Sequence, residues 1–309
     1  MKKAIVTGGA GFAGYSLVKS LLSEGFRVLC PVRPGSSHNK RLEALSEDSN
    51  GTKGELILLS LDMKDIRILS HWLGKKHIDM SGCLFFHLAW SGERDNFDEQ
   101  YANINITTDT VVTASRIGAV KIVITGSQAE YGLKAGGIRL QDGTISPVTE
   151  EALPEPVNAY GAAKTAAMYI SRDLARHLDI GWNWVRIFSL YGECEHPHTM
   201  LSYLRSTLER GELPHLSSCE QYWDYLDVRD AANALMSVAE NGKENEIYNL
   251  ASGDYRPLRE FTEIIRKRVR ADAAIDYAEA DPSSPSLSLR PSIEKLKRDT
   301  GWKPELPFS

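Results

Sequence analysis

Cysteine is scarce in this chain of 309 residues, and the few that are present lie far apart. They are Cys30, Cys83, Cys194 and Cys219, and no pair has the C-x-x-C spacing of zinc ligands or of a redox motif. The pattern predicts neither a metal site nor a disulfide framework. It favours idle or buried thiols in a reducing cytoplasm.

An excess of positive charge and a long apolar run are also missing. Lys and Arg total 36 against 41 Asp and Glu, so the chain lacks the basic surface that nucleic acid requires. No stretch of about 18 or more apolar residues is present to span a membrane. The apolar run after the N-terminal Met-Lys-Lys is only residues 4–6, which is too short for a signal peptide. We therefore expect a cytoplasmic protein that binds neither nucleic acid nor membrane.

Short apolar segments alternate with helical periodicity through the first 190 residues. Strands are predicted at residues 4–6, 27–30, 56–59, 83–86, 121–124 and 184–188, and helices over 12–23, near 107–117 and after Tyr160. Continuous apolar strands between helices indicate a parallel sheet that is covered on both faces. Right-handed crossovers then give a Rossmann-type, doubly wound α/β fold.

A glycine-rich segment, Thr-Gly-Gly-Ala-Gly-Phe-Ala-Gly at residues 7–14, joins the first strand to the first helix. Glycines let the backbone turn tightly and approach a pyrophosphate, and the helix N-terminus offers free N–H groups. Two glycine frames fit, Gly8/Gly11/Gly14 and Gly9/Gly11/Gly14. Because the segment has the required strand–loop–helix context, it predicts a bound dinucleotide.

The end of the second strand bears on which dinucleotide is bound. No carboxylate is present there to hold a ribose 2′-hydroxyl, and Arg33 stands where it would meet a 2′-phosphate. An ordinary surface arginine is the alternative. The sequence favours NADP, with NAD as the other option. Asp62, after the third strand, either contacts the adenine edge or caps the next helix.

After residue 190 the alternation of strand-like and helix-like segments is less regular. Helices are predicted over 200–209, 229–239 and 259–269, and a loop over 281–288. We expect residues 1–190, with a returning segment at about 225–252, to form the dinucleotide-binding domain. Residues 191–309 would mainly form a smaller α/β substrate-binding lobe at the carboxyl ends of the strands, where open α/β sheets hold ligands.

A Tyr-Gly-Ala-Ala-Lys segment provides the candidate chemistry. Tyr160 and Lys164 are four residues apart, so they share one face of the predicted helix. A nearby ammonium lowers the pKa of a phenol, which can then exchange the proton of an alcohol/ketone couple. Ser127, at the end of the fifth strand, would polarise the same carbonyl.

These segments together resemble the extended short-chain dehydrogenase/reductases, the epimerase/dehydratase family that modifies nucleotide sugars. The resemblance covers nearly the whole chain, and it is carried by TGGAGFAG (7–14), HLAW (87–90), Asn103 with Thr107, GSQAEYG (126–132), YGAAK (160–164), VRIFSLYG (185–192), DYLDVRDAANA (224–234) and GWKPELP (301–307).

The resemblance implies a catalytic triad of Ser127, Tyr160 and Lys164. With the residues argued above, the expected cofactor-binding set is Gly8, Gly11, Phe12, Ala13, Gly14, Arg33, Asp62, Met63, Leu88, Ala89, Trp90, Asn103, Thr125, Tyr160, Lys164 and Ile187. The expected substrate-binding set is Ser127, Gln128, Ser189, Thr199, Met200, Trp223 and Arg290. For Trp90 and Asn103, packing at a strand end is the alternative interpretation.

Departures from the family pattern reduce the number of reactions that the chain is expected to catalyse. The family's 4,6-dehydratases carry an Asp-Glu pair where this chain has Gln128 and Ala129, and its 3,5-epimerase/reductases carry a cysteine at the second of these positions. Neither Gln nor Ala does acid/base work at neutral pH. Many members also have Arg in place of Trp223 and Asn in place of Ser189. A ketone reduction, an alcohol oxidation or a C4 epimerisation remains.

Our leading prediction is an NADP-dependent reductase of a nucleotide-linked 4-keto-6-deoxy-hexose. The alternative is a nucleotide-sugar 4-epimerase with tightly bound NAD, and the third hypothesis is a cofactor-binding regulatory protein without turnover.

A homodimer is also expected, through the helices that begin near Asn103 and Tyr160. Candidates for its surface are Met168, Ser171, Arg172, Val111 and Val112.

Overall fold

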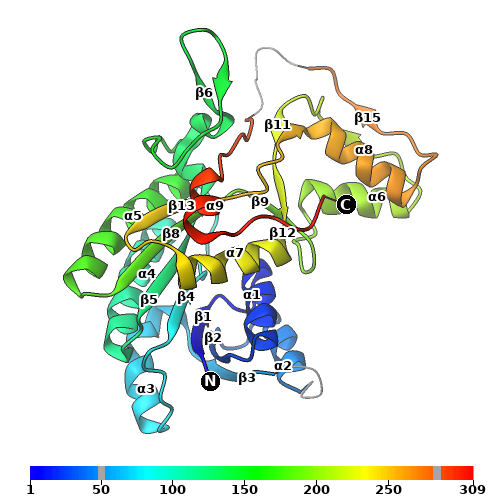
Figure 1. Ribbon diagram of the computed structural model, residues 1–309. Helices are drawn as coiled ribbons and strands as arrows, with labels where there is room; N and C mark the ends of the chain where they lie inside the picture. The colour runs from blue at the N-terminus through cyan, green and yellow to red at the C-terminus, as the bar shows by residue number, and fades with distance from the viewer. Residues whose placement is uncertain (48–52, 281–286, 309) are drawn as a thin grey trace.

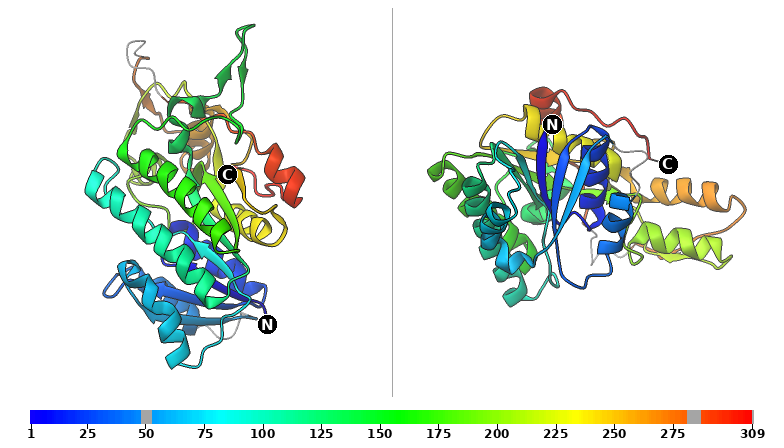
Figure 2. Two further views of the ribbon diagram at one scale, coloured as in Figure 1. Left: turned by 90° about the vertical axis from the view of Figure 1, so that its left-hand side faces the viewer. Right: turned by 90° about the horizontal axis from the view of Figure 1, so that it is seen from below.

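The computed structural model describes residues 1–47, 53–280 and 287–308 (Figure 1). The loop predicted over 281–288 lies, as far as residue 286, outside the described residues. The chain forms one large sheet with helices on both faces and a smaller lobe beside it (Figures 1 and 2).

Seven parallel strands make up the large sheet, in the order β3-β2-β1-β4-β5-β8-β13. They are β1 (Lys3–Thr7), β2 (Arg27–Val32), β3 (Glu55–Ser60), β4 (Leu84–His87), β5 (Lys121–Ser127), β8 (Gly181–Ile187) and β13 (Glu246–Leu250). The six predicted strands overlap β1 to β5 and β8. The order turns back between β1 and β4, where such a sheet leaves a crevice at the carboxyl ends of its strands. The predicted Rossmann-type fold is confirmed.

Helices cover each face of this sheet because each face is apolar. One face packs on α1 (Phe12–Ser23) and α7 (Val228–Asn241), with α2 (Asn39–Glu47) and α9 (Glu294–Thr300) at its margins. The other packs on the 3-10 helix η1 (Met63–Ile68), α3 (Leu69–Lys75), α4 (Phe97–Ile117) and α5 (Ala159–His177). Seen from below, the sheet lies between these two layers (Figure 2). The strands are therefore shielded from water on both faces, as a parallel sheet requires.

The smaller lobe packs around its own hydrophobic cluster, in which α6 (Met200–Glu209) lies against α8 (Leu258–Val269). Short strands complete it: β9 (Ser189–Tyr191), β10 (His215–Leu216), β11 (Tyr222–Trp223), β12 (Tyr225–Asp227), β14 (Arg256–Pro257) and β15 (Asp276–Tyr277). A 3-10 segment η2 (Gln128–Gly136) and a hairpin of β6 (Ile138–Arg139) and β7 (Ile145–Ser146) follow β5. The hairpin projects away from the sheet (Figure 1).

Helix α4 differs from its prediction, because it begins at Phe97 rather than near residue 107. Asn96 caps it by accepting a hydrogen bond from the Glu99 amide (3.2 Å). The buried face of its first turns carries Gln100, Asn103 and Thr107 rather than apolar residues. Apolar periodicity therefore missed ten residues of the helix, since their hydrogen-bonding partners are set by the tertiary fold.

No helix among the described residues is both long enough and apolar enough to cross a bilayer. Nor does the described part of the chain gather three or more His, Cys, Asp or Glu side chains as a metal site would.

Helix α1 approaches the glycine loop so closely that Gly14 has no room for a side chain. A Cβ atom at this position would lie 2.1 Å from the carbonyl oxygen of Gly8. We predict that Gly14→Ala lowers the free energy of unfolding by about 1–3 kcal/mol, the usual cost of overpacking. A denaturant titration of both proteins measures the loss.

Gly74→Ala, in α3, is the matched control. A Cβ there meets nothing within 4 Å, so the same change should leave stability unaltered or raise it by up to ~1 kcal/mol. Equal effects at the two glycines would contradict the close approach of α1 to the loop.

Candidate active site

A cavity of about 470 Å³ opens at the crevice between β1 and β4. Its lining includes residues from the glycine loop, from the ends of β2 and β3, from the loop after β4 and from α4. Nine of the predicted cofactor residues line it, namely Gly8, Gly11, Arg33, Asp62, Met63, Leu88, Ala89, Trp90 and Asn103. The fold thus brings five separate segments of the sequence to one concave site.

The glycine loop presents Gly8 and Gly11 to this cavity. Gly8 has a positive φ of 72°, and a Cβ on it would lie 2.7 Å from the Ala89 amide nitrogen. Gly9 instead faces the Cys30 sulfur, which would be 2.9 Å from its Cβ. Of the two possible glycine frames, the structure therefore places the Gly8/Gly11/Gly14 frame at the cavity, with Gly14 used for packing.

The N-terminus of α1 fits the pyrophosphate of a dinucleotide. Gly11 is its N-cap residue, and no side chain caps the helix. The Gly11 amide donates to the Gly8 carbonyl (2.9 Å), which closes the turn. Phe12 and Ala13 lie in the first turn of this helix, so their amides belong to its free N–H groups.

The end of the cavity next to β2 carries basic side chains and one hydroxyl. Arg33, Ser36, His38 and Lys64 line it. Asp62 is the one carboxylate among the described lining residues, and its side chain accepts a hydrogen bond from the Lys64 amide (3.0 Å). Asp62 thus caps η1 while it also lines the wall, so both sequence interpretations of its position apply.

Lys164 is buried at the inner end of the site, with only 3% of its surface exposed. Its Nζ donates to the carbonyl oxygen of Thr125 (2.6 Å) and lies 3.7 Å from the centroid of the Trp90 ring. Burial lowers the pKa of Lys164 to about 7, and the carboxylate of Glu130 acts in the opposite direction.

Tyr160 occupies the first turn of α5, where the Asn158 side chain caps the helix by accepting from the Gly161 amide (2.8 Å). Burial raises the pKa of Tyr160 above its ordinary value, while hydrogen bonding to Ser127 and the charge of Arg94 act against this. The upward direction is opposite to the sequence expectation. Lys164 lies 5.9 Å from the Tyr160 ring centroid, and desolvation outweighs the nearby positive charges.

Ser127 is the last residue of β5, and its backbone is hydrogen-bonded to the side chain of Glu130. Its amide donates to Glu130 Oε1 (2.8 Å), and its Oγ accepts from the Ala129 amide (3.2 Å). Glu130 is fully buried, and it also accepts from Trp184 Nε1 (2.9 Å) and from Arg186 Nε (2.7 Å). The serine therefore sits on a rigid polar support.

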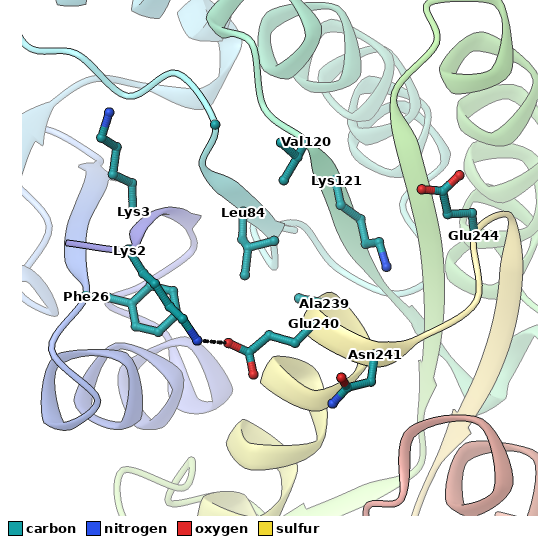
Figure 3. Close-up of a pocket in the computed structure, with 11 residues that line it drawn as sticks. Lys2, Lys3, Phe26, Leu84, Val120, Lys121, Ala239, Glu240, Asn241 and Glu244 are labelled. Carbon is teal, nitrogen blue, oxygen red and sulfur yellow. Dashed lines mark hydrogen bonds and ion pairs between the residues drawn. The ribbon is translucent and has the colours of Figure 1, made fainter.

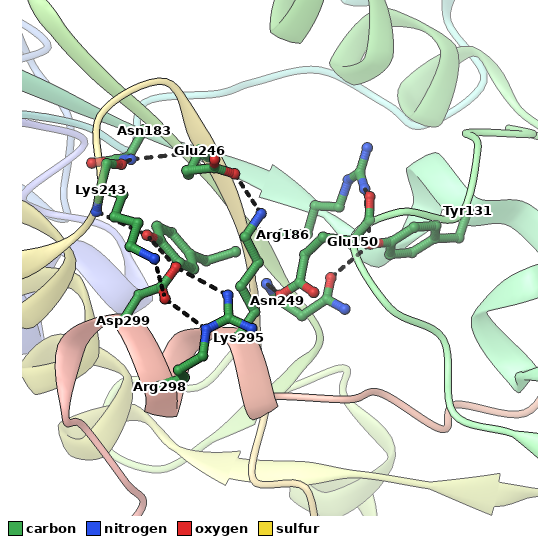
Figure 4. A network of polar contacts seen from close by, with 11 residues as sticks. Tyr131, Glu150, Asn183, Arg186, Lys243, Glu246, Asn249, Lys295, Arg298 and Asp299 are labelled. Carbon is green, nitrogen blue, oxygen red and sulfur yellow. Dashed lines mark hydrogen bonds and ion pairs between the residues drawn. The ribbon is translucent and has the colours of Figure 1, made fainter.

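A wider polar network continues from this support toward the C-terminal helix (Figure 4). Arg186 donates to the Tyr131 hydroxyl (2.8 Å), which in turn donates to Asn249 Oδ1 (2.8 Å). The amide of Asn249 donates to Glu150 (2.8 Å). The strand that carries Ser127 is thus linked through β8 to β13.

Three of the predicted cofactor residues, Asn103, Thr125 and Ile187, make structural contacts. Asn103 donates to the carbonyl of Ser91 (2.8 Å) and accepts from its amide (3.2 Å), so it fixes the loop after β4. Thr125 supplies the carbonyl that binds Lys164, and Ile187 is paired with Ser127 across β5 and β8.

The predicted substrate residues do not meet at one place as the cofactor residues do. Ser189 pairs with Tyr225 between β9 and β12, and Trp223 and Met200 both pack on the cluster of the smaller lobe. Arg290 donates to the Gly136 carbonyl (2.9 Å) and lies 4.0 Å from the Tyr222 ring centroid. Thr199 caps α6 and donates to Glu195 (2.6 Å).

Two buried polar atoms in this region, Gln128 Oε1 and Trp223 Nε1, have no hydrogen-bond partner among the described residues. Such atoms usually have a partner, so both are available to a ligand.

Sequence reasoning missed several residues of the site. Arg94 lies 4.9 Å from the Tyr160 ring centroid, and its carbonyl accepts from the Tyr160 amide (2.9 Å). Glu130 and Gln100 were also missed. Gln100, Asn103 and Thr107 recur at the spacing of one helix face, and this polar periodicity is a signal that could have found Gln100.

A second cavity, of about 640 Å³, lies at the opposite, amino ends of the strands (Figure 3). The ammonium groups of Lys2, Lys3 and Lys121 in its wall bind Glu240 (2.6 Å), Asp79 (2.6 Å) and the Gly242 carbonyl (2.8 Å) respectively. Open α/β sheets bind ligands at the carboxyl ends of their strands, so the chemistry is assigned to the other cavity.

Comparison with known proteins now decides the family. The model of the "NAD dependent epimerase/dehydratase family" matches residues 4–251. The chain belongs to this family. It is an NAD-dependent enzyme of the epimerase/dehydratase type that acts on nucleotide sugars.

Among its relatives are two 4-epimerases. The chain is 27% identical to UDP-arabinose 4-epimerase 1 of Arabidopsis thaliana over 301 residues, which cover 88% of this chain and 68% of the relative. It is 26% identical to UDP-glucose 4-epimerase of Corynebacterium glutamicum over 326 residues, covering 98% and 91%. The fold matches the crystal structure of UDP-glucose 4-epimerase from Thermotoga maritima with a TM-score of 0.80 and 20% identity, covering 99% and 94% of the two chains.

The first prediction for this site concerns the proton donor. Tyr160→Phe removes the hydroxyl beside Ser127, and turnover should fall by ~10²–10⁴ because general acid/base help is lost. Cofactor affinity should stay within about twofold. Steady-state kinetics and a cofactor titration measure the two effects.

Tyr169→Phe, on the exposed side of the same helix, is the control and should leave turnover unchanged. A Tyr160→Phe enzyme that retained more than about a tenth of wild-type turnover would rule out this residue as the proton donor.

Proposed function

We propose that this enzyme interconverts nucleotide sugars that differ in configuration at C4. A bound nicotinamide cofactor would supply the redox chemistry: it would take a hydride from C4 and return it to the opposite face of the 4-keto sugar. The observation that carries the proposal is the convergence of Ser127, Tyr160 and Lys164 beside the cavity that the glycine loop lines, without an acid at Gln128 or Ala129.

The chain's own groups divide the work in this proposal. Tyr160, in its phenolate form, takes the proton of the C4 hydroxyl as the ketone forms, and the resulting phenol returns the proton as the alcohol reforms. The hydroxyl of Ser127 holds the same oxygen. Loss of water is not expected, because Gln128 and Ala129 cannot act as acid and base.

The similarity to the two curated 4-epimerases supports epimerisation over the ketone reduction that the sequence favoured. One observation keeps the reductase as a second candidate. Arg33, Ser36, His38 and Lys64 line the cavity where a 2′-phosphate would lie, and this lining favours NADP. A reductase exchanges its cofactor, whereas an epimerase retains it.

The function is tested with a substrate panel and with cofactor analysis. Purified protein is denatured and the released cofactor identified, and the protein is then given UDP-arabinose, UDP-glucose and nucleotide-linked 4-keto sugars. Epimerisation predicts a C4 epimer with no net cofactor consumption. Stoichiometric NADPH oxidation by a 4-keto sugar would establish the reductase, and turnover of none of these compounds would refute both functions.

A second prediction tests the cofactor preference. For the reductase candidate, Arg33→Ala should weaken NADPH binding by roughly 10- to 100-fold and leave NADH binding nearly unchanged, because a charge-assisted contact to the 2′-phosphate is lost. Titration of each cofactor measures both affinities. Lys40→Ala, an exposed position of α2 that does not line the cavity, is the control. Equal losses for both cofactors would contradict the NADP preference.

We further propose a homodimer through α4 and α5, which lie side by side (Figure 2). Three of the predicted surface residues are wrong, because Met168, Ser171 and Val111 are buried inside the chain itself. They point toward the sheet, and the outward stripe carries Tyr101, Tyr169 and Ile170, whose exposed fractions are 66%, 46% and 48%. A second copy of this paired-helix surface would cover these apolar groups.

The dimer prediction is tested by light scattering at micromolar concentration, which should give about twice the chain mass of 34.3 kDa. Ile170→Glu places a charge in the interface and should give a monomer. Leu213→Glu is the matched control, since Leu213 has the same 48% exposure but lies in the smaller lobe. Dissociation by both variants, or by neither, would count against this surface.

A further inference from the structure

The ammonium of Lys164 has little conventional stabilisation for a buried charge. The ammonium donates a hydrogen bond to the Thr125 carbonyl, and it forms no ion pair among the described residues. The nearest carboxylate that influences it, Glu130, is already bound to Ser127, Trp184 and Arg186. A desolvated cation in this position needs another partner.

That partner is the indole of Trp90. The Lys164 Nζ lies 3.7 Å from the Trp90 ring centroid, compared with 5.9 Å for the rings of Tyr160 and Trp184. The same indole meets the Tyr160 ring edge-on, with centroids 6.1 Å apart and planes at 89°. One side chain therefore contacts both members of the proton-transfer pair.

The indole is fixed by Gln100 of α4. Trp90 Nε1 donates to Gln100 Oε1 (2.8 Å), and Gln100 Nε2 donates to the Glu93 carbonyl (3.0 Å). Gln100 is 1% exposed, so this contact is shielded from water. The hydrogen bonds leave the face of the ring, rather than its edge, turned toward the ammonium.

We propose that Trp90, oriented by Gln100, is a positioning residue that keeps Lys164 charged and aligned with Tyr160. The proposal rests on the proposed function, in which Tyr160 and Lys164 serve the proton transfer. It adds two residues with a defined role, and it predicts that the aromatic face, rather than the bulk of Trp90, is required.

Other charged and titratable groups near this pair are Glu130 from η2, His87 from β4 and Arg94 from the loop before α4. Burial lowers the pKa of His87 to about 3, so this imidazole is neutral at working pH. A substitution at Trp90 leaves all of these groups in place. Any change in the titration of Lys164 would therefore report on the ring, through either its aromatic face or the water that it excludes.

The first test needs neither substrate nor cofactor. The emission of Trp90 is taken as the difference between the wild type and Trp90→Phe, and is followed from about pH 5 to 9. Loss of the ammonium charge should give a transition near pH 7, where the pKa of Lys164 lies. The transition should vanish in Lys164→Met. Its absence from the wild type, or its survival in Lys164→Met, would overturn the proposal.

The second test is the pH dependence of kcat/KM, with the nucleotide sugar of the panel that turns over. Trp90→Leu removes the face that favours the charged lysine, so the pKa of Lys164 falls and the charge is lost at lower pH. The alkaline limb should therefore move down by about one pH unit. Trp90→Phe keeps a ring and should restore most of the shift, while Gln100→Leu should lie between these two variants.

The proposed function and the role of Trp90 are refuted by different results. Full activity in Tyr160→Phe would refute the proposed function. Loss of activity in Tyr160→Phe, together with an unshifted alkaline limb in Trp90→Leu, would refute only the role of Trp90. A uniform loss of rate at every pH, equal for Trp90→Leu and Trp90→Phe, would mean that the indole merely fills space.

Discussion

The fully buried carboxylate of Glu130 is the constraint on which the site depends. It binds the backbone of Ser127, the indole of Trp184 and the guanidinium of Arg186, which come from the two neighbouring strands β5 and β8. A buried charge is tolerated only when its partners are all present, and removal of one leaves the rest uncompensated. The end of β5 therefore cannot shift without disturbing β8, and the serine keeps a fixed place at the crevice.

Aromatic side chains surround Lys164, whereas polar groups hold Ser127 in place. The lysine is enclosed by Trp90, Tyr160 and Trp184, and its pKa lies near 7 because burial disfavours its charge. A group poised in this range responds strongly to small changes in its surroundings. In the proposed mechanism, a rigidly held serine hydroxyl that donates to the sugar oxygen is combined with a proton donor whose electrostatics depend on one indole ring.

Much of the fold follows from local patterns in the sequence. The first helix and α6 have the bounds that the sequence pattern predicts, and the apolar strand segments fall in the sheet. The prediction fails for the start of α4, where buried Gln100 and Asn103 replace the expected apolar residues. It also fails for Met168 and Ser171, because periodicity does not say which face of a small-residue helix packs on its own sheet.

The sequence by itself determined the residue types of the chemistry, because a glycine loop and a Tyr-x-x-x-Lys segment need only local spacing to be recognised. Only the tertiary structure decided which glycine meets the cavity and which groups surround the charges. Gly8 faces Ala89, Trp90 faces Lys164, and Arg186 binds Glu130, although these pairs come from different elements. Their contacts depend on the order and register of the strands. Desolvation raises the pKa of Tyr160 and lowers that of Lys164, and it exists only once the chain has folded.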